Sequence, residues 1–360
     1  MGPFRMAVIG CGAVVEHHHL PALAADPDVE VVALVDRDLA RARKLAARWG
    51  AREAAAELGG VARRFDGAIV ALPNHLHAPV SCELLRRGIH VLVEKPMAPT
   101  VAECDAMIAA AAEGGSTLAV GLEFRFFAST ELVRDLLRQG LVGELRGFDL
   151  RQGVVPRWPF ASDFVLRRET AGGGVLADFG SHVLDLLLCW LGDWEDVDYA
   201  DDARGGLESD CELALTMRGG LAGRVEISRT RDLANVCRFE GERGTLEVGV
   251  WDPAPEVVLH VPGSALRLAG RAAGDSSALG LAGRAAGDAA ADATFQGAFR
   301  RQLADFVTAA RTGGRPRVPG EEGRRAIALV EACYARRRPL EPPWEEPPEL
   351  AAWRERAVAR

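Results

Sequence analysis

Short apolar runs alternate with amphipathic segments over the first third of the chain. The apolar runs predict strands at residues 5–9, 29–35, 67–72, 90–93 and 117–120. Apolar positions at helical spacing predict helices at residues 39–49, 78–87 and 101–112, and another that ends near residue 25. Near-continuous apolar strands are typical of parallel sheets that are covered on both faces. We therefore predict an α/β fold that begins with a Rossmann-type, doubly wound parallel sheet over residues 1–121.

The pattern changes after about Gly121, where turn residues alone separate several predicted strands. These strands are expected at residues 145–152, 211–217, 221–230, 235–240, 244–250 and 256–261. Helices are expected at residues 131–139, 174–191, 294–310 and 322–335. This pattern predicts a second, α+β domain at residues 122–338, with a large, mostly antiparallel open sheet.

Two further segments differ from their surroundings in composition. The octapeptide LAGRAAGD occurs at residues 268–275 and again at 281–288. Two copies of so short a unit do not make a repeat architecture, so we interpret residues 268–292 as an Ala/Gly-rich insertion. Residues 339–360 contain Pro-Pro twice and are interpreted as a Pro-rich C-terminal tail.

Charge and cysteine content restrict the classes of partner. The net charge is −8, and the longest basic cluster is Arg336–Arg338, so nucleic acid is not expected as a partner. No stretch reaches about 18 apolar residues, so the sequence predicts no membrane span. The seven cysteines include no C-x-x-C pair, and buried, reduced thiols predict a cytoplasmic protein.

A glycine-rich turn follows the first predicted strand and opens a helix. It comprises Gly10, Cys11, Gly12, Ala13, Val14 and Val15. Such a turn lets backbone approach a pyrophosphate, while the helix N-terminus supplies N–H groups. Val15 stands where the dinucleotide fingerprint has its third glycine.

The end of the second strand bears on the choice of cofactor. Asp36 can accept hydrogen bonds from both ribose hydroxyls and would repel a 2′-phosphate, which favours NAD. Arg37 could stack on adenine or accept that phosphate, so NADP stays open. The neighbouring run His17-His18-His19 does not predict a metal site, because successive helical side chains point about 100° apart. We expect those histidines to pack at the helix start and expect no metal.

Lysine is rare in this chain. Of 43 basic residues only Lys44 and Lys95 are lysines, and lysine, unlike arginine, can give up its proton when desolvated. Lys44 falls on a charged helix where arginine would serve equally well. Lys95 ends a predicted strand, at the sheet edge where ligands of open α/β sheets bind. A surface ion pair with Glu94 is the alternative, but we favour a functional role.

A second chemical cluster follows the run Gly172-Gly173-Gly174. Asp178, His182 and Asp185 are spaced four and three residues apart on a predicted apolar helix, so they share one helix face. Two carboxylates on that face can fix the tautomer of the histidine and raise its basicity. The glycines permit close backbone approach to a ligand.

Taken together, these motifs resemble the Gfo/Idh/MocA family of NAD(P)-dependent oxidoreductases, which act mostly on sugars, cyclitols and related polyols. The resemblance spans about residues 4–335. It is carried by Gly10-Cys11-Gly12, His19-Leu20-Pro21-Ala22-Leu23, Asp36, Ala71-Leu72-Pro73-Asn74 with His77, Glu94-Lys95-Pro96, Arg125, the glycine run with Asp178 and His182, and Phe299 to Ala310.

The resemblance implies a role for each matching residue. Lys95 would bond the reacting oxygen, His182 would donate or accept its proton, and Asp178 would orient them. The Lys95–Pro96 bond is often cis in the family. Pro73, Asn74, His77 and Glu94 would line the cofactor, and Arg125 would lie at the domain junction, close to cofactor and substrate. The resemblance also implies homodimers or homotetramers that form through the C-terminal sheet.

Several questions stay open at this point. Arg157 and Arg168 are candidate substrate ligands, although both could be surface arginines. We expect burial beside a cationic nicotinamide to lower the pKa of Lys95. A non-catalytic dinucleotide- or sugar-binding regulator is one alternative function. Transient oxidation that drives epimerisation, elimination or glycoside cleavage is another.

Overall fold

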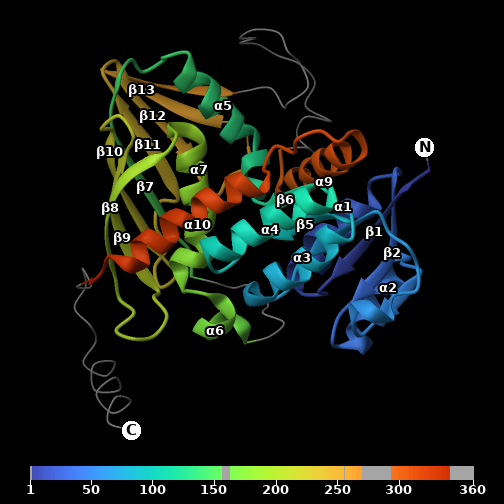
Figure 1. Cartoon of the computed structure of the whole chain (residues 1–360). Helices are drawn as coiled ribbons and strands as arrows, with labels where there is room; N and C mark the ends of the chain where they lie inside the picture. The colour runs from blue at the N-terminus through green and yellow to red at the C-terminus, as the bar shows by residue number, and fades with distance from the viewer. Residues whose placement is uncertain (1, 156–162, 255, 270–292, 341–360) are drawn as a thin grey trace.

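The computed structural model describes residues 2–155, 163–254, 256–269 and 293–340, and its two sheets lie at opposite ends of the molecule (Figure 1). Arg157, most of the expected Ala/Gly-rich insertion and nearly all of the expected Pro-rich tail lie outside the described residues. Strand β14 (Ser264–Ala269) includes the first two residues of that insertion.

The first sheet has six strands in the order β3-β2-β1-β4-β5-β6, and every pair is parallel. The strands are β1 (Phe4–Ile9), β2 (Val29–Val35), β3 (Glu53–Ala55), β4 (Gly67–Val70), β5 (His90–Glu94) and β6 (Leu118–Gly121). Alternate residues of β1 enter different cores, Ala7 and Ile9 on one face and Met6 and Val8 on the other. The predicted doubly wound parallel sheet is confirmed.

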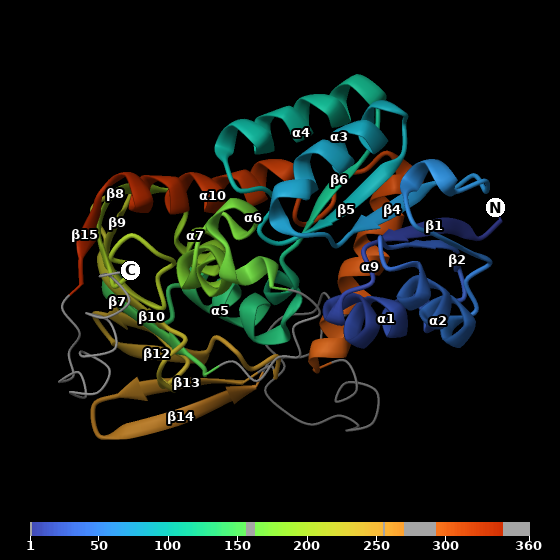
Figure 2. The same cartoon turned by 90° about the horizontal axis from the view of Figure 1, so that it is seen from below.

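Helices cover both faces of this sheet (Figure 2). One face carries α3 (His77–Arg86) and α4 (Val101–Gly114), and the other carries α1 (Leu20–Ala24), α2 (Leu39–Trp49) and α9 (Phe295–Thr312). Short helical turns are η1 (Val15–His19), η2 (Leu58–Gly60) and η3 (Asn74–Leu76). The start of α4 is fixed by a capping box between Thr100 and Glu103, which satisfies backbone N–H groups that a helix leaves free.

Helix α9 lies on the first sheet although it follows the second sheet in the chain. Phe299, Leu303 and Phe306 enter the same buried cluster as Met6 and Val8. The amphipathic pattern predicted this helix, but its periodicity does not say which sheet the apolar side covers. A boundary at residue 121 therefore separates the two sheets, but it assigns α9 to the second domain although α9 packs on the first sheet.

The second sheet has nine strands in the order β14-β13-β12-β11-β7-β10-β9-β8-β15. Besides β14 these are β7 (Leu145–Gly153), β8 (Trp194–Asp201), β9 (Asp210–Met217), β10 (Ala222–Ser228), β11 (Val236–Gly241), β12 (Gly244–Gly249), β13 (Glu256–Val261) and β15 (Arg337–Pro339). All pairs are antiparallel except β7 with β10 and β8 with β15. The predicted mostly antiparallel sheet is thus confirmed, although β8, β14 and β15 were not predicted.

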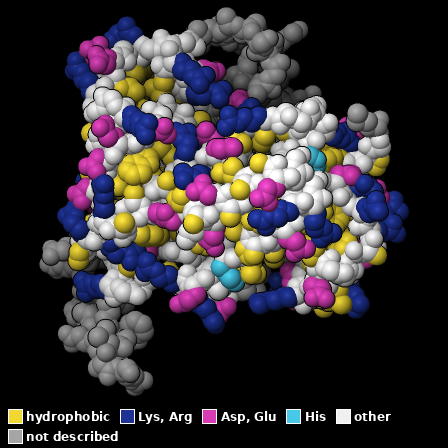
Figure 3. Space-filling model, viewed as in Figure 1, with side chains coloured by type: hydrophobic (Ala, Val, Ile, Leu, Met, Phe, Trp, Pro, Cys, Tyr) yellow, Lys and Arg dark blue, Asp and Glu magenta, His cyan; other side chains and the backbone are white. Residues whose placement is uncertain are grey.

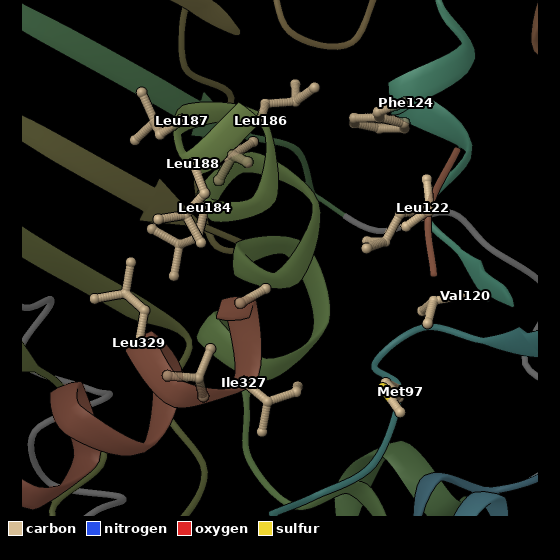
Figure 4. Packing of buried hydrophobic residues seen from close by; sticks show 14 of the residues in the cluster. Met97, Val120, Leu122, Phe124, Leu184, Leu186, Leu187, Leu188, Ile327 and Leu329 are labelled. Carbon is tan, nitrogen blue, oxygen red and sulfur yellow. The ribbon is translucent and has the colours of Figure 1, made fainter. Parts of the chain in front are cut away.

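Helices fill the space between this sheet and the first one (Figure 2). They are η4 (Glu123–Phe126), α5 (Ala128–Arg138), η5 (Phe164–Leu166), α6 (Arg168–Ala171), η6 (Leu176–Gly180), α7 (Ser181–Leu191) and α10 (Gly320–Ala335). Figure 4 shows the leucines of α7 beside Ile327 and Leu329 of α10, with Val120 of β6 and Met97, which follows β5, nearby. One apolar core therefore joins α7 to both sheets.

Three observations concern a possible membrane span, the cysteines and the surface charge. The segment Arg168–Leu191 is long and apolar enough to cross a membrane, with a mean hydropathy of 1.4, but 72% of its apolar window is buried inside the protein. That burial is typical of a core helix. All seven cysteines are free thiols, and six of them are buried. Charges of both signs are interspersed over the face in Figure 3.

Candidate active site

A cavity of about 1050 Å³ lies where the carboxyl ends of β1, β2, β4 and β5 face η6, α7 and the second sheet. Parallel α/β sheets bind ligands at this edge. Its lining includes Gly10, Cys11, Gly12, Ala13, Val14, Asp36, Arg37, Pro73, Asn74, Glu94, Lys95, Asp178 and His182. Most of the predicted site residues are therefore brought to one cavity.

The glycine-rich turn forms one end of this cavity. Gly10 has φ +97°, and a Cβ there would lie 2.1 Å from the carbonyl oxygen of Ala71, so only glycine fits. A Cβ on Gly12 would meet open space, as backbone that approaches a ligand requires. Val15 is fully buried in the core and does not line the cavity, so the replaced third glycine costs the site no space.

Asp36 is held at the rim by two backbone amides. Cys11 N donates to Oδ2 and Asp38 N donates to Oδ1, each over 2.8 Å. The carboxylate is thereby fixed between the glycine-rich turn and the exposed Arg37, with lone pairs left for hydroxyl donors. The open turn and the fixed carboxylate leave space and hydrogen-bonding capacity for a dinucleotide at this end of the cavity.

The histidines of η1 have packing roles. His19 Nε2 lies 2.6 Å from Glu94 Oε1, with both side chains buried, and His18 stacks on Phe299 with ring centroids 4.7 Å apart. Burial acts to raise the pKa of Glu94, but the His19 contact and the charge of Lys95 lower it overall. Within the described ranges no group of three or more His, Cys, Asp or Glu could hold a metal ion.

Lys95 meets Asp178 at the centre of the cavity. The Lys95–Pro96 peptide is cis, as the resemblance implies. Lys95 Nζ donates to Asp178 Oδ1 over 2.7 Å and to the Asp178 carbonyl over 3.3 Å. Burial acts to lower the pKa of Lys95, but Asp178 and then Glu123 and Glu94 raise it overall. Our expectation of a lowered pKa is therefore wrong for the protein alone, because three carboxylates surround the ammonium group.

Asp178 is held between two cations. Its Oδ2 accepts from Arg229 Nη2 over 3.2 Å, opposite Lys95. Burial acts to raise the pKa of Asp178, but Lys95 and Arg229 lower it overall. The spacing argument placed this carboxylate beside His182. It lies elsewhere because η6 is a π-helical turn, which changes the phase of the helix between the two residues.

His182 lies against an aromatic wall of the cavity. Its ring stacks on Phe124, with centroids 4.2 Å apart and planes 16° from parallel. Its Nδ1 is buried and receives no hydrogen bond from residues that the structure describes, and Oε2 of Glu123 lies 3.8 Å away. Burial, followed by the charge of Lys95, places the pKa of His182 well below its ordinary value of 6.5. The imidazole is therefore neutral near neutral pH.

Arg125 does not reach the cavity, contrary to our expectation for cofactor and substrate. Its Nε and Nη2 donate to the two oxygens of Asp185 over 2.6 and 2.7 Å, and Nη2 also donates to Glu322 over 2.9 Å. Asp185 is likewise occupied by Arg125 and does not fix His182. The pair is buried, so it joins η4 to α7 within the core.

Two other expected ligands also lie outside the cavity lining. His77 is fully buried, with Nδ1 2.9 Å from the Pro96 carbonyl and Nε2 2.8 Å from the Leu72 carbonyl. It therefore tethers the loops that carry Asn74 and Lys95. Arg168 is exposed, with its guanidinium 5.8 Å from the centroid of the Tyr334 ring.

The glycine run is explained mainly by packing. A Cβ on Gly173 would lie 2.0 Å from the Tyr334 hydroxyl, and one on Gly174 would lie 2.1 Å from the Glu208 carbonyl oxygen. The buried Glu208 carboxylate accepts from Gly174 N over 2.8 Å. Protein atoms, rather than the expected ligand, make the closest approach, although Gly173 does line the cavity.

Sequence reasoning missed part of the cavity wall. The missed residues include Glu123, Phe124, Phe179, Arg229, Trp251 and Phe295. Glu123 alone had a local signal, as an acidic residue in the apolar stretch 117–128. The others come from separate elements that only the folded chain brings together.

Comparisons with known proteins agree with this geometry. Residues 4–122 match the model of an oxidoreductase family with an NAD-binding Rossmann fold, and residues 130–247 match the GFO/IDH/MocA C-terminal domain. The chain is 34% identical over 277 residues to an Amycolatopsis mediterranei protein named as a UDP-kanosamine synthase oxidoreductase subunit, over 68% of this chain and 74% of that one. It is 32% identical over 195 residues to D-glucoside 3-dehydrogenase of Escherichia coli, over 53% and 54% of the two chains.

A solved structure shows the same likeness. It is a variant of the 3-ketoreductase KijD10 from Actinomadura kijaniata in complex with TDP-benzene and NADP, with a TM-score of 0.80 and 26% identity over 95% of this chain and 100% of that one. The matched models, the relatives and the shared fold lead to one conclusion. The chain belongs to the Gfo/Idh/MocA family of NAD(P)-dependent oxidoreductases.

Proposed function

We propose that this oxidoreductase converts a carbinol and a keto carbon of a sugar ring into one another. The observation that carries the proposal is that Lys95 and His182 line one cavity together with several aromatic side chains. Phe124, Phe179 and Trp251 offer flat apolar surfaces that suit the C–H faces of a sugar. Relatives named as a glucoside 3-dehydrogenase and as dTDP-sugar 3-reductases support this substrate class.

The dinucleotide would be held by the glycine-rich turn, Asp36, Pro73, Asn74 and Glu94. When bound, it supplies or accepts the hydride. We propose that NAD is preferred, because the fixed Asp36 carboxylate would repel a 2′-phosphate. Titrating NADH and NADPH into the protein and following cofactor fluorescence tests this preference.

The residues of the chain handle the charge and the proton at the reacting oxygen. The Lys95 ammonium, kept protonated by its carboxylate neighbours, would donate a hydrogen bond to that oxygen and stabilise negative charge on it. Neutral His182 would take the proton of a hydroxyl in the oxidation direction. Asp178 would hold Lys95 in position through its 2.7 Å ion pair.

A dehydrogenase assay over glycosides, inositols and nucleotide sugars tests the proposal through the absorbance of the reduced nicotinamide. Lys95→Ala and His182→Ala are expected to lower kcat by about 10²- to 10⁴-fold while NADH still binds. Lys44→Ala, which removes the other, exposed lysine, should match the wild type. Normal turnover in both site variants, or no turnover of any panel member by the wild type, would contradict the proposal.

Two broader expectations also remain proposals. We propose a homodimer or homotetramer through the second sheet, whose outer face carries the cross-strand ion pairs Arg224–Glu212 and Arg238–Glu247. Light scattering after size exclusion measures the mass. We also propose a cytoplasmic location, which free, mostly buried thiols support.

A further inference from the structure

Glu123 and His182 face each other inside the cavity, and among the described residues no other side chain hydrogen-bonds to either. Oε2 of Glu123 and Nδ1 of His182 are 3.8 Å apart, and the two side chains are 10% and 5% exposed. No hydrogen bond reaches Nδ1 from the described residues. A buried nitrogen of this kind normally has a partner, and the carboxyl of Glu123 is the polar group that stands opposite it.

The position of the imidazole is fixed by its surroundings. Phe124 stacks on the ring over 4.2 Å, which leaves rotation of the Glu123 side chain as the simplest way to close the remaining gap. Catalytic hydrogen bonds are often longer in the free protein than in the complex with substrate. Glu123 and His182 both line the cavity, so a substrate that fills it would press on both groups.

The charges around Glu123 favour its neutral form. Two charged groups, Glu94 and Lys95, act on it from the end of β5. Helix α7 contributes His182 and Asp185, and the turn η4 that carries Glu123 also carries Arg125. Burial, followed by the charge of Glu94, raises the pKa of Glu123 to about 8, although Lys95 acts to lower it. Asp185 is neutralised by Arg125, so the like charge closest in effect is that of Glu94. Glu123 can therefore gain or lose a proton near neutral pH.

We propose that Glu123 is the positioning residue for His182 and exchanges a proton with Nδ1, which decides the tautomer that His182 presents to the substrate. Protonated Glu123 would donate to Nδ1, so that Nε2 carries the hydrogen. Ionised Glu123 would accept from Nδ1–H, so that Nε2 presents its lone pair. This inference rests on the proposed function only for the identity of the substrate.

The two tautomers suit the two directions of the reaction. In reduction, the keto carbon gains a hydride, its oxygen takes the proton from Nε2, and the proton of Glu123 passes to Nδ1. The products are an alcohol, a neutral imidazole and an ionised Glu123. In oxidation, Nε2 takes the hydroxyl proton and Nδ1 gives its proton to the Glu123 carboxylate while a hydride leaves the carbon. His182, whose pKa is very low, never has to remain doubly protonated.

The test follows the tautomer of His182 directly. In the NADH-bound protein labelled with ¹⁵N-histidine, the His182 signals are assigned through a His182→Asn variant and followed by NMR across pH 6 to 9.5. We expect the hydrogen to move from Nε2 to Nδ1 as the pH rises through about 8. Glu123→Gln, which cannot ionise, should abolish this inversion. Glu123→Asp should restore it in part, and Glu131→Gln, an acidic residue on α5 outside the cavity, should leave it unchanged.

A kinetic arm separates this inference from the proposed function. On a sugar that the wild type converts, Glu123→Gln should lower kcat by about 10- to 100-fold in both directions, with KM changed by less than about threefold. Its pH profile should lose the inflection near 8. A tautomer inversion without turnover of any sugar would support the inference and overturn the substrate proposal. A His182 tautomer that stays constant across pH in the wild type, or inverts equally in Glu123→Gln, would overturn the inference whatever the turnover.

Discussion

Replacing Arg125 by methionine tests whether this arginine stabilises the core or binds a ligand. In the structure its guanidinium makes hydrogen bonds of 2.6 and 2.7 Å to Asp185 and one of 2.9 Å to Glu322. The Arg125 and Asp185 side chains are only 8% and 1% exposed. Methionine keeps much of the volume but leaves the Asp185 carboxylate buried without its counter-charge.

The magnitude follows from that uncompensated charge. Removing one partner of a buried ion pair costs about 3–5 kcal/mol of the free energy of unfolding. With a urea dependence of about 3 kcal/mol per molar, the denaturation midpoint should fall by about 1 M or more. The double variant Arg125→Met/Asp185→Leu should recover most of this loss, because an apolar pair replaces both charges. Glu322 keeps Arg325 as its partner over 2.9 Å in either variant.

Urea denaturation followed by tryptophan fluorescence measures the midpoint, and NADH titration measures the cofactor dissociation constant. The dissociation constant should stay within about threefold of the wild type, since the guanidinium does not line the cavity. Arg86→Met is the control, because its ion pair with Glu113 is exposed and should leave the midpoint unchanged. A variant of Arg125 with normal stability and tenfold weaker NADH binding would refute this reasoning.

Three further outcomes are expected. Lys95→Arg keeps the charge beside Asp178, but a planar guanidinium cannot present the compact ammonium of lysine to the reacting oxygen, so kcat should fall by about 100-fold or more while NADH affinity, measured by fluorescence, is retained. Asp36→Ala removes the hydrogen-bond acceptor at the cavity rim and should weaken NADH binding by about tenfold. The variant should also prefer NADH over NADPH less strongly than the wild type does. An equal loss of affinity for both cofactors would argue against a contact between Asp36 and the ribose. Burial lowers the pKa of both His77 and His182 below the ordinary histidine value of 6.5. As the pH falls below 6.5, the unfolded chain therefore binds protons at these two histidines that the folded protein does not bind. Stability should therefore be intact above that value and decline toward pH 5, and His77→Leu should flatten a plot of urea midpoint against pH.

Local patterns in the sequence were sufficient where one property defines an element. Strand β2 is a near-continuous apolar run that ends at Val35, just before Asp36, and α2 ends at Trp49, before Gly50 in a left-handed conformation (φ 74°). Both were predicted with their exact bounds. Strand β8 was missed because Glu195, Asp196 and Asp198 are exposed and interrupt the apolar run. The pairing of such a strand depends on its neighbours in the sheet rather than on its own residues.

The candidate site shows the same division. Lys95 stood out because lysine is rare in this chain and because this one lies at the end of a strand. His182 stood out because it follows a glycine run and has acidic residues at helical spacing. The ion partners could not be predicted, since the π-helical turn η6 shifts the helix phase between Asp178 and His182. Arg125, the partner of Asp185, comes from a separate element that only the folded chain brings to α7. Glu123 was missed because burial, rather than residue type, makes its carboxyl chemically unusual.

The place of α9 has a consequence for how the chain folds during synthesis. Phe299, Leu303 and Phe306 cover apolar residues of the first sheet, yet they leave the ribosome long after β6 is complete. Until then one face of a nascent six-stranded sheet stays partly uncovered, a state that invites aggregation or chaperone binding. A fragment cut after residue 121 would retain that exposed face, so we expect the cofactor-binding half to be poorly soluble unless residues 295–312 are supplied with it.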